Sequence, residues 1–343
     1  MISLSRFIIV CFLIALSSCS SSDRPELHLY IWSSYIKPEL IERFETETGC
    51  RVVVDTYDSN ESMYAKFKAG AIGYDLVLPS NYMIELMIEQ GMLQPLNLSL
   101  IPNIRYLDAN YTKFASQATS HYGVPYMVSL AGIGFRRDKI EILDPSWDIF
   151  GESKWQGRMT MLNDIREVLG AALIQLGYSA NTTNPQEIDE ATTLVIEWKK
   201  NLAKFESEQY KNGIANAEYL VVQGYNGDLL QVMEENNQVD FAYPKKGVLF
   251  SIDYMVIPRN APQTELAHAF INFMQRPEVA AENMEYTFFL CPNQGAYEKL
   301  SNGLKSNPVL FPPAEVLEKL EIIQNLGPDI RLYNQAWDNI KAN

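Results

Sequence analysis

Two aromatic residues, Trp32 and Tyr35, stand at the end of an apolar stretch of alternating pattern, residues 27–32. The alternation predicts a half-buried strand, and Ser33 and Ser34 predict a turn after it. In open α/β sheets, ligands bind outside the carboxyl ends of the strands. The two rings are therefore placed to cover a small apolar or cationic ligand, although one of them could instead close the hydrophobic core.

Acidic residues stand at two further places where a predicted strand meets a predicted helix. Asp164 and Glu167 have the spacing of a helix-capping pair, and acids in a first turn also suit the helix dipole. The same spacing leaves two carboxylates at one junction, where they could hold an ammonium group. Asp228 follows Tyr225 at a similar junction and has the same two interpretations.

Asp253 is a single charge inside the apolar run of residues 250–257. An isolated buried carboxylate is costly, so this one requires a partner. That partner is either a cationic ligand or a buried arginine or lysine.

The chain carries no local signature of an enzyme. It has no Gly-x-Ser-x-Gly, no His-Glu-x-x-His and no Walker loop, and Gly132-Ile133-Gly134 lacks the third glycine of a dinucleotide-binding turn. The three histidines are scattered and no Cys-x-x-Cys occurs, so we expect no metal site and no cofactor. We expect no catalytic activity; a glycosidase with a carboxylate pair is the enzyme alternative, because its acids have no sequence signature.

The N-terminus indicates export. Arg6 precedes an apolar run, residues 7–16, that is too short to span a bilayer but suits a signal peptide. The run ends in Leu16-Ser17-Ser18-Cys19, which resembles a bacterial lipobox. We therefore predict a signal peptide over residues 1–18, lipidation of Cys19, a polar tether over residues 19–26, and a periplasmic or cell-surface location on a membrane.

The formal net charge is −14, from 28 basic and 42 acidic residues, which makes nucleic acid a poor partner. Of the 4 cysteines, Cys50 and Cys291 remain after the signal and the lipid site are set aside. They fall in different predicted elements, and we expect two separate thiols.

Strands and helices alternate along the chain, which predicts an α/β fold with mostly parallel sheets. A first series has strands at 27–32, 51–56 and 75–78, with helices from Pro38 to Gly49, over residues 60–69 after the cap Ser59, and up to Gly91. A second series has strands at 132–136, 158–162, 219–223, 239–243 and 250–257, with helices at 165–176, 185–203, 227–236, 264–285 and 313–341.

Two such series predict two lobes joined near residues 126–131 and 250–254, with a ligand cleft between them. Two crossings, rather than one linker, would act as a hinge. We assign residues 27–128 and 254–298 to lobe 1, and residues 129–253 and 299–343 to lobe 2.

Several stretches resemble the spermidine/putrescine-binding proteins of polyamine ABC importers. They are YIWSSY (30–35), YDSNESMYAK (57–66), YDLVLPS (74–80), DIREV (164–168), LGYSANTTNP (176–185) and CPN (291–293). The agreement covers nearly the whole exported chain in order. The resemblance implies a two-lobed, monomeric solute-binding protein that closes on spermidine or putrescine and delivers it to a membrane permease driven by an ATPase.

The resemblance also implies a ligand site, residue by residue. The aromatic box falls on Trp32, Tyr35 and Tyr82, with Ser33 and Ser80 as hydroxyl partners, and the carboxylates fall on Asp164, Glu167 and Asp253. Tyr225 stands where the family has a tryptophan. Asp228 matches an acid of the putrescine-binding branch, and Ser207 and Gln324 match polar contact positions.

Two positions depart from the family pattern. Ser34 replaces an acid and Ser251 replaces an aromatic residue, so the preference between spermidine and putrescine stays open. The alternatives are a binding protein for another organic cation or for ferric ion, and a sensor or adhesin that has kept the pocket without a permease. An iron site would need clustered Tyr and His ligands, so the scattered histidines weaken the ferric alternative.

Overall fold

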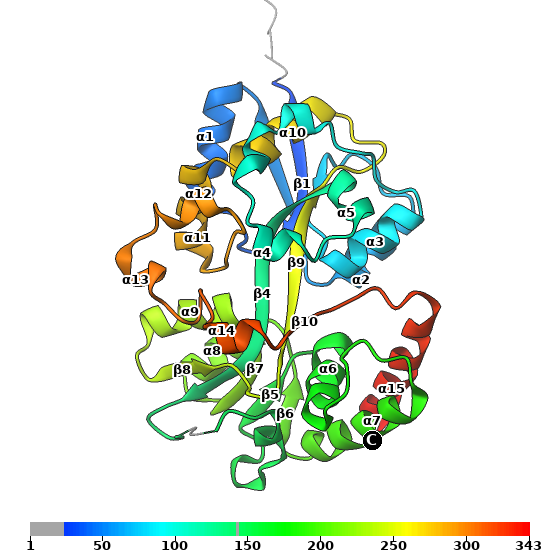
Figure 1. Cartoon of the computed structure of the whole chain (residues 1–343), viewed down its shortest axis with the longest axis vertical. Coiled ribbons are helices and arrows are strands. Elements are labelled where there is room, and N and C mark those ends of the chain that lie inside the picture. The colour runs from blue at the N-terminus through cyan, green and yellow to red at the C-terminus, as the bar shows by residue number, and fades with distance from the viewer. Residues whose placement is uncertain (1–23, 142–143) are drawn as a thin grey trace, which may run out of the picture.

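The structure, a computed structural model, describes residues 24–141 and 144–343; the predicted signal peptide and Cys19 lie outside them. Figure 1 shows two lobes, one above the other, joined by long strands. Lobe 1 contains β1 (Glu26–Trp32), β2 (Arg51–Tyr57), β3 (Leu76–Val77), α1 (Pro38–Thr48), α2 (Asn60–Lys68), α3 (Asn81–Glu89), α4 (Ala109–Thr112), α5 (Gln117–Tyr122), α10 (Thr264–Met274), α11 (Pro277–Thr287) and α12 (Gln294–Tyr297).

Lobe 2 contains β5 (Met159–Met161), β6 (Leu202–Phe205), β7 (Val221–Tyr225), β8 (Val239–Ala242), α6 (Ile165–Leu176), α7 (Pro185–Lys199), α8 (Tyr210–Ala215), α9 (Asn226–Glu235) and α15 (Ile330–Ala342). The connecting elements are β4 (Gly123–Arg136), β9 (Val248–Val256), β10 (Leu320–Ile322), α13 (Asn302–Lys305) and α14 (Ala314–Leu317). Short 3₁₀ helices cover Leu98–Leu100, Pro102–Tyr106, Trp147–Gly151, Ser153–Trp155 and Gly327–Asp329.

The strand order is β2-β1-β3-β9-β4-β7-β5-β6, with β10 beside β9 and β8 beside β4. In each lobe the strands that are joined through helices pair in parallel, as β1 does with β2 and β3, and β5 with β6 and β7. Of the strands that join the lobes, β9 is antiparallel to β3 and β4 and parallel to β10. The predicted α/β fold with two lobes is therefore confirmed.

Strand β4 changes its partner halfway along its length. Residues 123–130 pair with β9, whereas residues 131–136 pair with β7 and β8. Gly132 lies in the second half, where an added Cβ would stand 2.2 Å from the Phe241 ring, so the glycine serves close packing within a strand. The change of partner lies beside the lobe boundary that the sequence predicts.

Local signals in the sequence set several helix ends as predicted. Pro38 begins α1, and Gly49 ends it with φ +73°. Ser59 caps α2, accepting a hydrogen bond from the Ser62 backbone, and Gly177 ends α6 with φ +89°.

Three predicted helices were wrong in extent. The helix expected over 264–285 is two helices, because Pro277 cannot continue a helix and instead begins α11. The helix expected over 313–341 is α14, β10 and α15, with Gly327 and Pro328 in the break. The helix expected over 185–203 ends at Lys199, and its last residues belong to β6.

The buried residues form two hydrophobic clusters. One runs from lobe 1 through the joining strands to α8, α9 and β8 of lobe 2, and the other lies around Trp147 and Trp198 in lobe 2. The half-buried Tyr82 packs against both clusters. Cys50 and Cys291 are buried and separate, as predicted. In residues 24–141 and 144–343, none of the helices has the length and apolar character needed to cross a bilayer.

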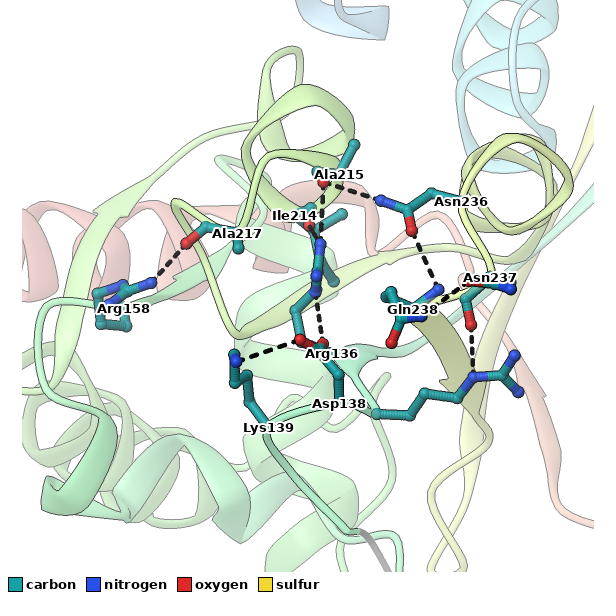
Figure 2. A network of polar contacts seen from close by, with 11 residues as sticks. Arg136, Asp138, Lys139, Arg158, Ile214, Ala215, Ala217, Asn236, Asn237 and Gln238 are labelled. Atoms are coloured by element: carbon teal, nitrogen blue, oxygen red, sulfur yellow. Dashed lines mark hydrogen bonds and ion pairs between the residues drawn. The ribbon is translucent and has the colours of Figure 1, made fainter.

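Side chains cap the C-terminal end of the short helix α8, as Figure 2 shows. Arg136 donates to the carbonyl oxygens of Ile214 (3.3 Å) and Ala215 (2.9 Å), and Asn236 donates to the latter at 2.9 Å. Arg136 also pairs with Asp138 at 2.8 Å. These bonds satisfy helix-end carbonyls that would otherwise lack donors.

Replacing Arg136 should therefore destabilise lobe 2. We expect Arg136→Met to lower the free energy of unfolding by about 2–3 kcal/mol, because buried carbonyl groups lose a charged donor. Arg137→Met is the control, since the side chain of Arg137 is 52% exposed, against 10% for Arg136. Urea unfolding compares the two variants, and equal loss of stability in both would contradict this role of Arg136.

Candidate ligand-binding site

The Trp32 ring, at the end of β1, is fixed by a bond to the main chain that follows β3. The Trp32 indole donates to the Leu78 carbonyl oxygen at 3.0 Å, and its ring lies 4.6 Å from that of Tyr57. Ser33 and Ser34 form the exposed turn that follows, with Ser34 at φ +56°. Tyr35 is buried after this turn, so only Trp32 keeps a partly exposed face.

Asp253 is the buried acid of this part of the site. It is 4% exposed and accepts hydrogen bonds from the Tyr35 and Ser80 hydroxyls, both at 2.6 Å. Burial raises its pKa from the usual 3.8 to about 6, while the two hydroxyls lower it. Neither donor is charged, and in the described part of the chain no arginine or lysine forms an ion pair with Asp253. The buried Arg or Lys partner that the sequence left open is therefore not seen.

A chain of hydrogen bonds leads from Asp253 towards lobe 2. Ser80 accepts from the Asn60 side chain at 3.0 Å, and the same amide donates to the Tyr82 hydroxyl at 3.0 Å. Tyr82 donates in turn to Glu61 at 3.2 Å. Asn60 is 5% exposed, so it holds these hydroxyl groups in one arrangement.

The acids of lobe 2 stand at the start of α6. Asp164 is the N-cap and accepts from the backbone of Arg166 (2.8 Å) and Glu167 (3.1 Å), so the capping interpretation is confirmed for Asp164. Glu167 is 2% exposed, and its Oε2 has no hydrogen-bond partner. Burial, and secondly the charge of Asp164, raise the pKa of Glu167 well above its usual value. An unpaired buried carboxylate of this kind favours a proton or a cation.

Arg166 lies next to these acids but bonds elsewhere. Its guanidinium donates to the Gln324 carbonyl oxygen and to the Asn181 side chain, each at 2.7 Å, and lies over the Tyr333 ring. Burial lowers its pKa. The guanidinium therefore offsets part of the local negative charge without forming a direct pair with Glu167.

Groups from both lobes come close around Tyr82. Burial raises its pKa, and the charges of Glu61 in lobe 1 and Asp164 in lobe 2 raise it further. The pKa of Tyr225 is raised by burial and by Glu167 and Asp164. Asp164 thus lies near both Tyr82 of lobe 1 and Tyr225 of lobe 2.

The remaining predicted residues lie at the edge of this arrangement. Asp228 accepts from the Tyr210 hydroxyl at 2.6 Å and pairs with Lys211 at 3.0 Å. The Ser207 hydroxyl accepts from the Asn163 backbone at 3.0 Å, and Gln324 is exposed. The structure brings together Trp32, Tyr35, Ser80 and Tyr82 of lobe 1 with Asp253 of the joining strand β9, and it groups Asp164, Glu167 and Tyr225 in lobe 2.

Sequence reasoning missed Asn60, Glu61 and Lys211. Asn60 and Glu61 directly follow the predicted cap Ser59, and Lys211 lies in no motif. No local pattern in the sequence therefore marks any of the three as part of the site. Among the described residues, no cluster of three or more His, Cys, Asp or Glu side chains is arranged to hold a metal ion.

Comparison with known proteins identifies the family. The profile of the bacterial extracellular solute-binding proteins matches residues 39–312. The putrescine-binding periplasmic protein SpuD of Pseudomonas aeruginosa is 35% identical over 342 residues, covering 94% of this chain and 93% of that protein. The spermidine/putrescine-binding periplasmic protein of Escherichia coli is 33% identical over 334 residues, covering 96% and 95%.

The structural comparison agrees. The crystal structure of the Tp0655 (TpPotD) lipoprotein of Treponema pallidum matches with a TM-score of 0.84 at 33% identity, covering 93% of this chain and all of that one (100%). Both comparisons extend over nearly the whole chain, as did the resemblance found in the sequence. The chain belongs to the bacterial extracellular solute-binding protein family.

Proposed function

We propose that this chain is the substrate-binding component of an ABC importer and that it binds a polyamine, spermidine or putrescine, between its lobes. The observation that carries the proposal is Asp253, a buried carboxylate with two neutral hydroxyl donors and no cation among the described residues. An ammonium group of the ligand would supply the missing positive charge. The names of the relatives from P. aeruginosa and E. coli support the same class of ligand.

A polyamine at neutral pH is a chain of methylene groups with an ammonium at each end. Asp253 would take one end and Glu167, whose Oε2 has no partner, the other. The face of Trp32 would cover the chain between them, and a cation–π contact contributes roughly 0.5–2 kcal/mol. Asp253 is bonded to Tyr35 and Ser80 of lobe 1, whereas Glu167 belongs to α6 of lobe 2. A ligand bound to both acids would therefore hold the lobes closed, and the closed form is the state that a permease can distinguish.

Calorimetry on a soluble form that lacks residues 1–19 tests this function. We expect spermidine, putrescine or both to bind, with affinities in the micromolar to nanomolar range, roughly −8 to −12 kcal/mol. Absence of binding by both amines would refute the proposal. We further propose that the protein works as a monomer without catalytic activity and passes its ligand to permease subunits in the membrane.

Trp32→Ala should weaken polyamine binding about tenfold or more, because the ring face and its apolar contact area are lost together. The indole N–H is held by the main chain, so the ring is already in place before the ligand arrives. Trp155→Ala is a control, since that ring lies in lobe 2, 4.0 Å from the Lys154 ammonium group. Similar affinities for the wild-type protein and Trp32→Ala, measured by calorimetry, would remove Trp32 from the site.

Cys19→Ser should release the protein from membranes, because we propose that a lipid on this cysteine is the anchor. Cys11→Ser, inside the predicted signal peptide, is the matched control and should leave the protein in the membrane fraction. Fractionation of cells that express each variant gives the answer. Retention of Cys19→Ser in membranes would argue against a lipid anchor at this residue.

A further inference from the structure

Lys211 provides a cation of the protein's own at the edge of the candidate site. Its ammonium group lies 3.0 Å from one carboxylate oxygen of Asp228, and the Tyr210 hydroxyl donates to the other oxygen at 2.6 Å. The Lys211 and Asp228 side chains are 32% and 19% exposed, so the pair is only partly screened by water. Both oxygens of Asp228 are therefore occupied, and its charge is compensated, before any ligand arrives.

The pair borders the rings and acids described above. The Tyr225 backbone donates to the same Tyr210 hydroxyl at 3.3 Å. Gly227, at the start of α9, packs against the Phe289 ring, where an added Cβ would meet ring atoms at 2.6 Å. Phe289 in turn makes an edge-to-face contact with Tyr35, with centroids 5.7 Å apart. The first turn of α9, which carries Asp228, thus lies between Tyr225 and the Phe289 ring. Phe289 contacts Tyr35, which donates a hydrogen bond to Asp253.

The position of Lys211 is fixed from both sides of α8. Arg136 and Asn236 hold the C-terminal carbonyl groups of this helix, as Figure 2 shows. At its other end the Tyr210 ring packs on Gly224 of β7, where a Cβ would stand 2.5 Å from the ring. Tyr210 is fully buried, so the residue next to it is anchored beside Asp228.

We propose that Lys211 is a specificity-determining residue, because its ammonium group occupies Asp228 and so withdraws this acid from the ligand. This inference rests on the proposed polyamine function. The site then offers Asp253 and Glu167 to an amine, whereas an amine that needs Asp228 has to displace a tethered cation. Withdrawing Asp228 lowers the affinity for amines that need this acid, and it adds no contact for the other amines.

Lys211→Met tests this inference, with putrescine and spermidine as probes in calorimetry. We expect the affinity for at least one amine to rise roughly fivefold or more, since a charge-assisted bond to Asp228 becomes available, and the ratio of the two affinities to change. Lys211→Arg should behave like the wild type. Lys204→Met is the matched control, because it removes the same charge from lobe 2, where Lys204 pairs with Glu206 at 3.6 Å, and should change either affinity less than about twofold.

The double variant Lys211→Met/Asp228→Asn separates a local effect from a general one. It should lose the gain of Lys211→Met, since the freed acid is gone. Unchanged or weaker binding by Lys211→Met, or a gain that survives in the double variant, would overturn the inference while wild-type binding still supports the proposed function. If neither the wild type nor Lys211→Met binds either amine, both proposals fail.

Discussion

Asp253→Asn is expected to weaken polyamine binding at least tenfold. The substitution keeps the size of the side chain and an oxygen that can still accept a hydrogen bond, but it removes the negative charge that an ammonium group would meet. A hydrogen bond to a charged group contributes about 1.5–3 kcal/mol, which corresponds to roughly 10- to 150-fold in affinity. Calorimetry with spermidine and putrescine measures the loss.

Asp240→Asn is the matched control for this variant. It removes one negative charge from a half-buried position in lobe 2, where Asp240 lies 3.8 Å from Arg137, and should change the affinity less than about twofold. Both variants should melt at temperatures close to that of the wild type, because Asp253 has no cation in the described structure that the substitution would leave unpaired. If Asp253→Asn and Asp240→Asn bind alike, Asp253 does not contact the ligand.

Polyamine affinity should fall steeply as the pH drops below about 6. Asp253 has a pKa of about 6 in the free protein, so below this pH a proton has to leave before an ammonium group can bind. One such proton lowers the affinity about tenfold per pH unit. Burial also raises the pKa of Glu167, so a proton held there would have to be released as well when the ligand binds.

The same pKa shifts predict the stability of the free protein. The folded-state pKa of Asp253 lies above its usual 3.8, so this carboxyl group favours folding below about pH 3.8, and that contribution is lost as the pH rises through 6. Because the ligand should bind more tightly at higher pH, the rise in melting temperature that it causes should increase from pH 5 to pH 7.5. Calorimetry in buffers of different ionisation enthalpy should also detect proton release near pH 6, where Asp253 titrates. A polyamine affinity that stays constant between pH 5 and 7.5 would contradict both the expected loss of binding at low pH and the expected change in the ligand-induced rise in melting temperature.

The candidate site was predicted from sequence in its residue types but not in its pairings. Trp32 and Asp253 stood out because a ring at a strand end and a charge in an apolar run are local patterns. Asn60, which links Ser80 to Tyr82, has no such pattern, because its role depends on two residues that only folding brings next to it. Asp228 was predicted as a ligand residue, and its pairing with Lys211 is a feature of the structure alone.

The sequence by itself determined where most elements begin and end, since prolines, glycines and capping side chains act on the backbone within a few residues. Pro38, Gly49, Ser59 and Gly177 all act in this way. It also determined the alternation of strands and helices that leads to two α/β lobes. The tertiary structure decided which groups meet, as with Tyr35 and Asp253, which are 218 residues apart in the chain. Such contacts depend on the packing of both lobes around β4 and β9, and no local rule contains that information.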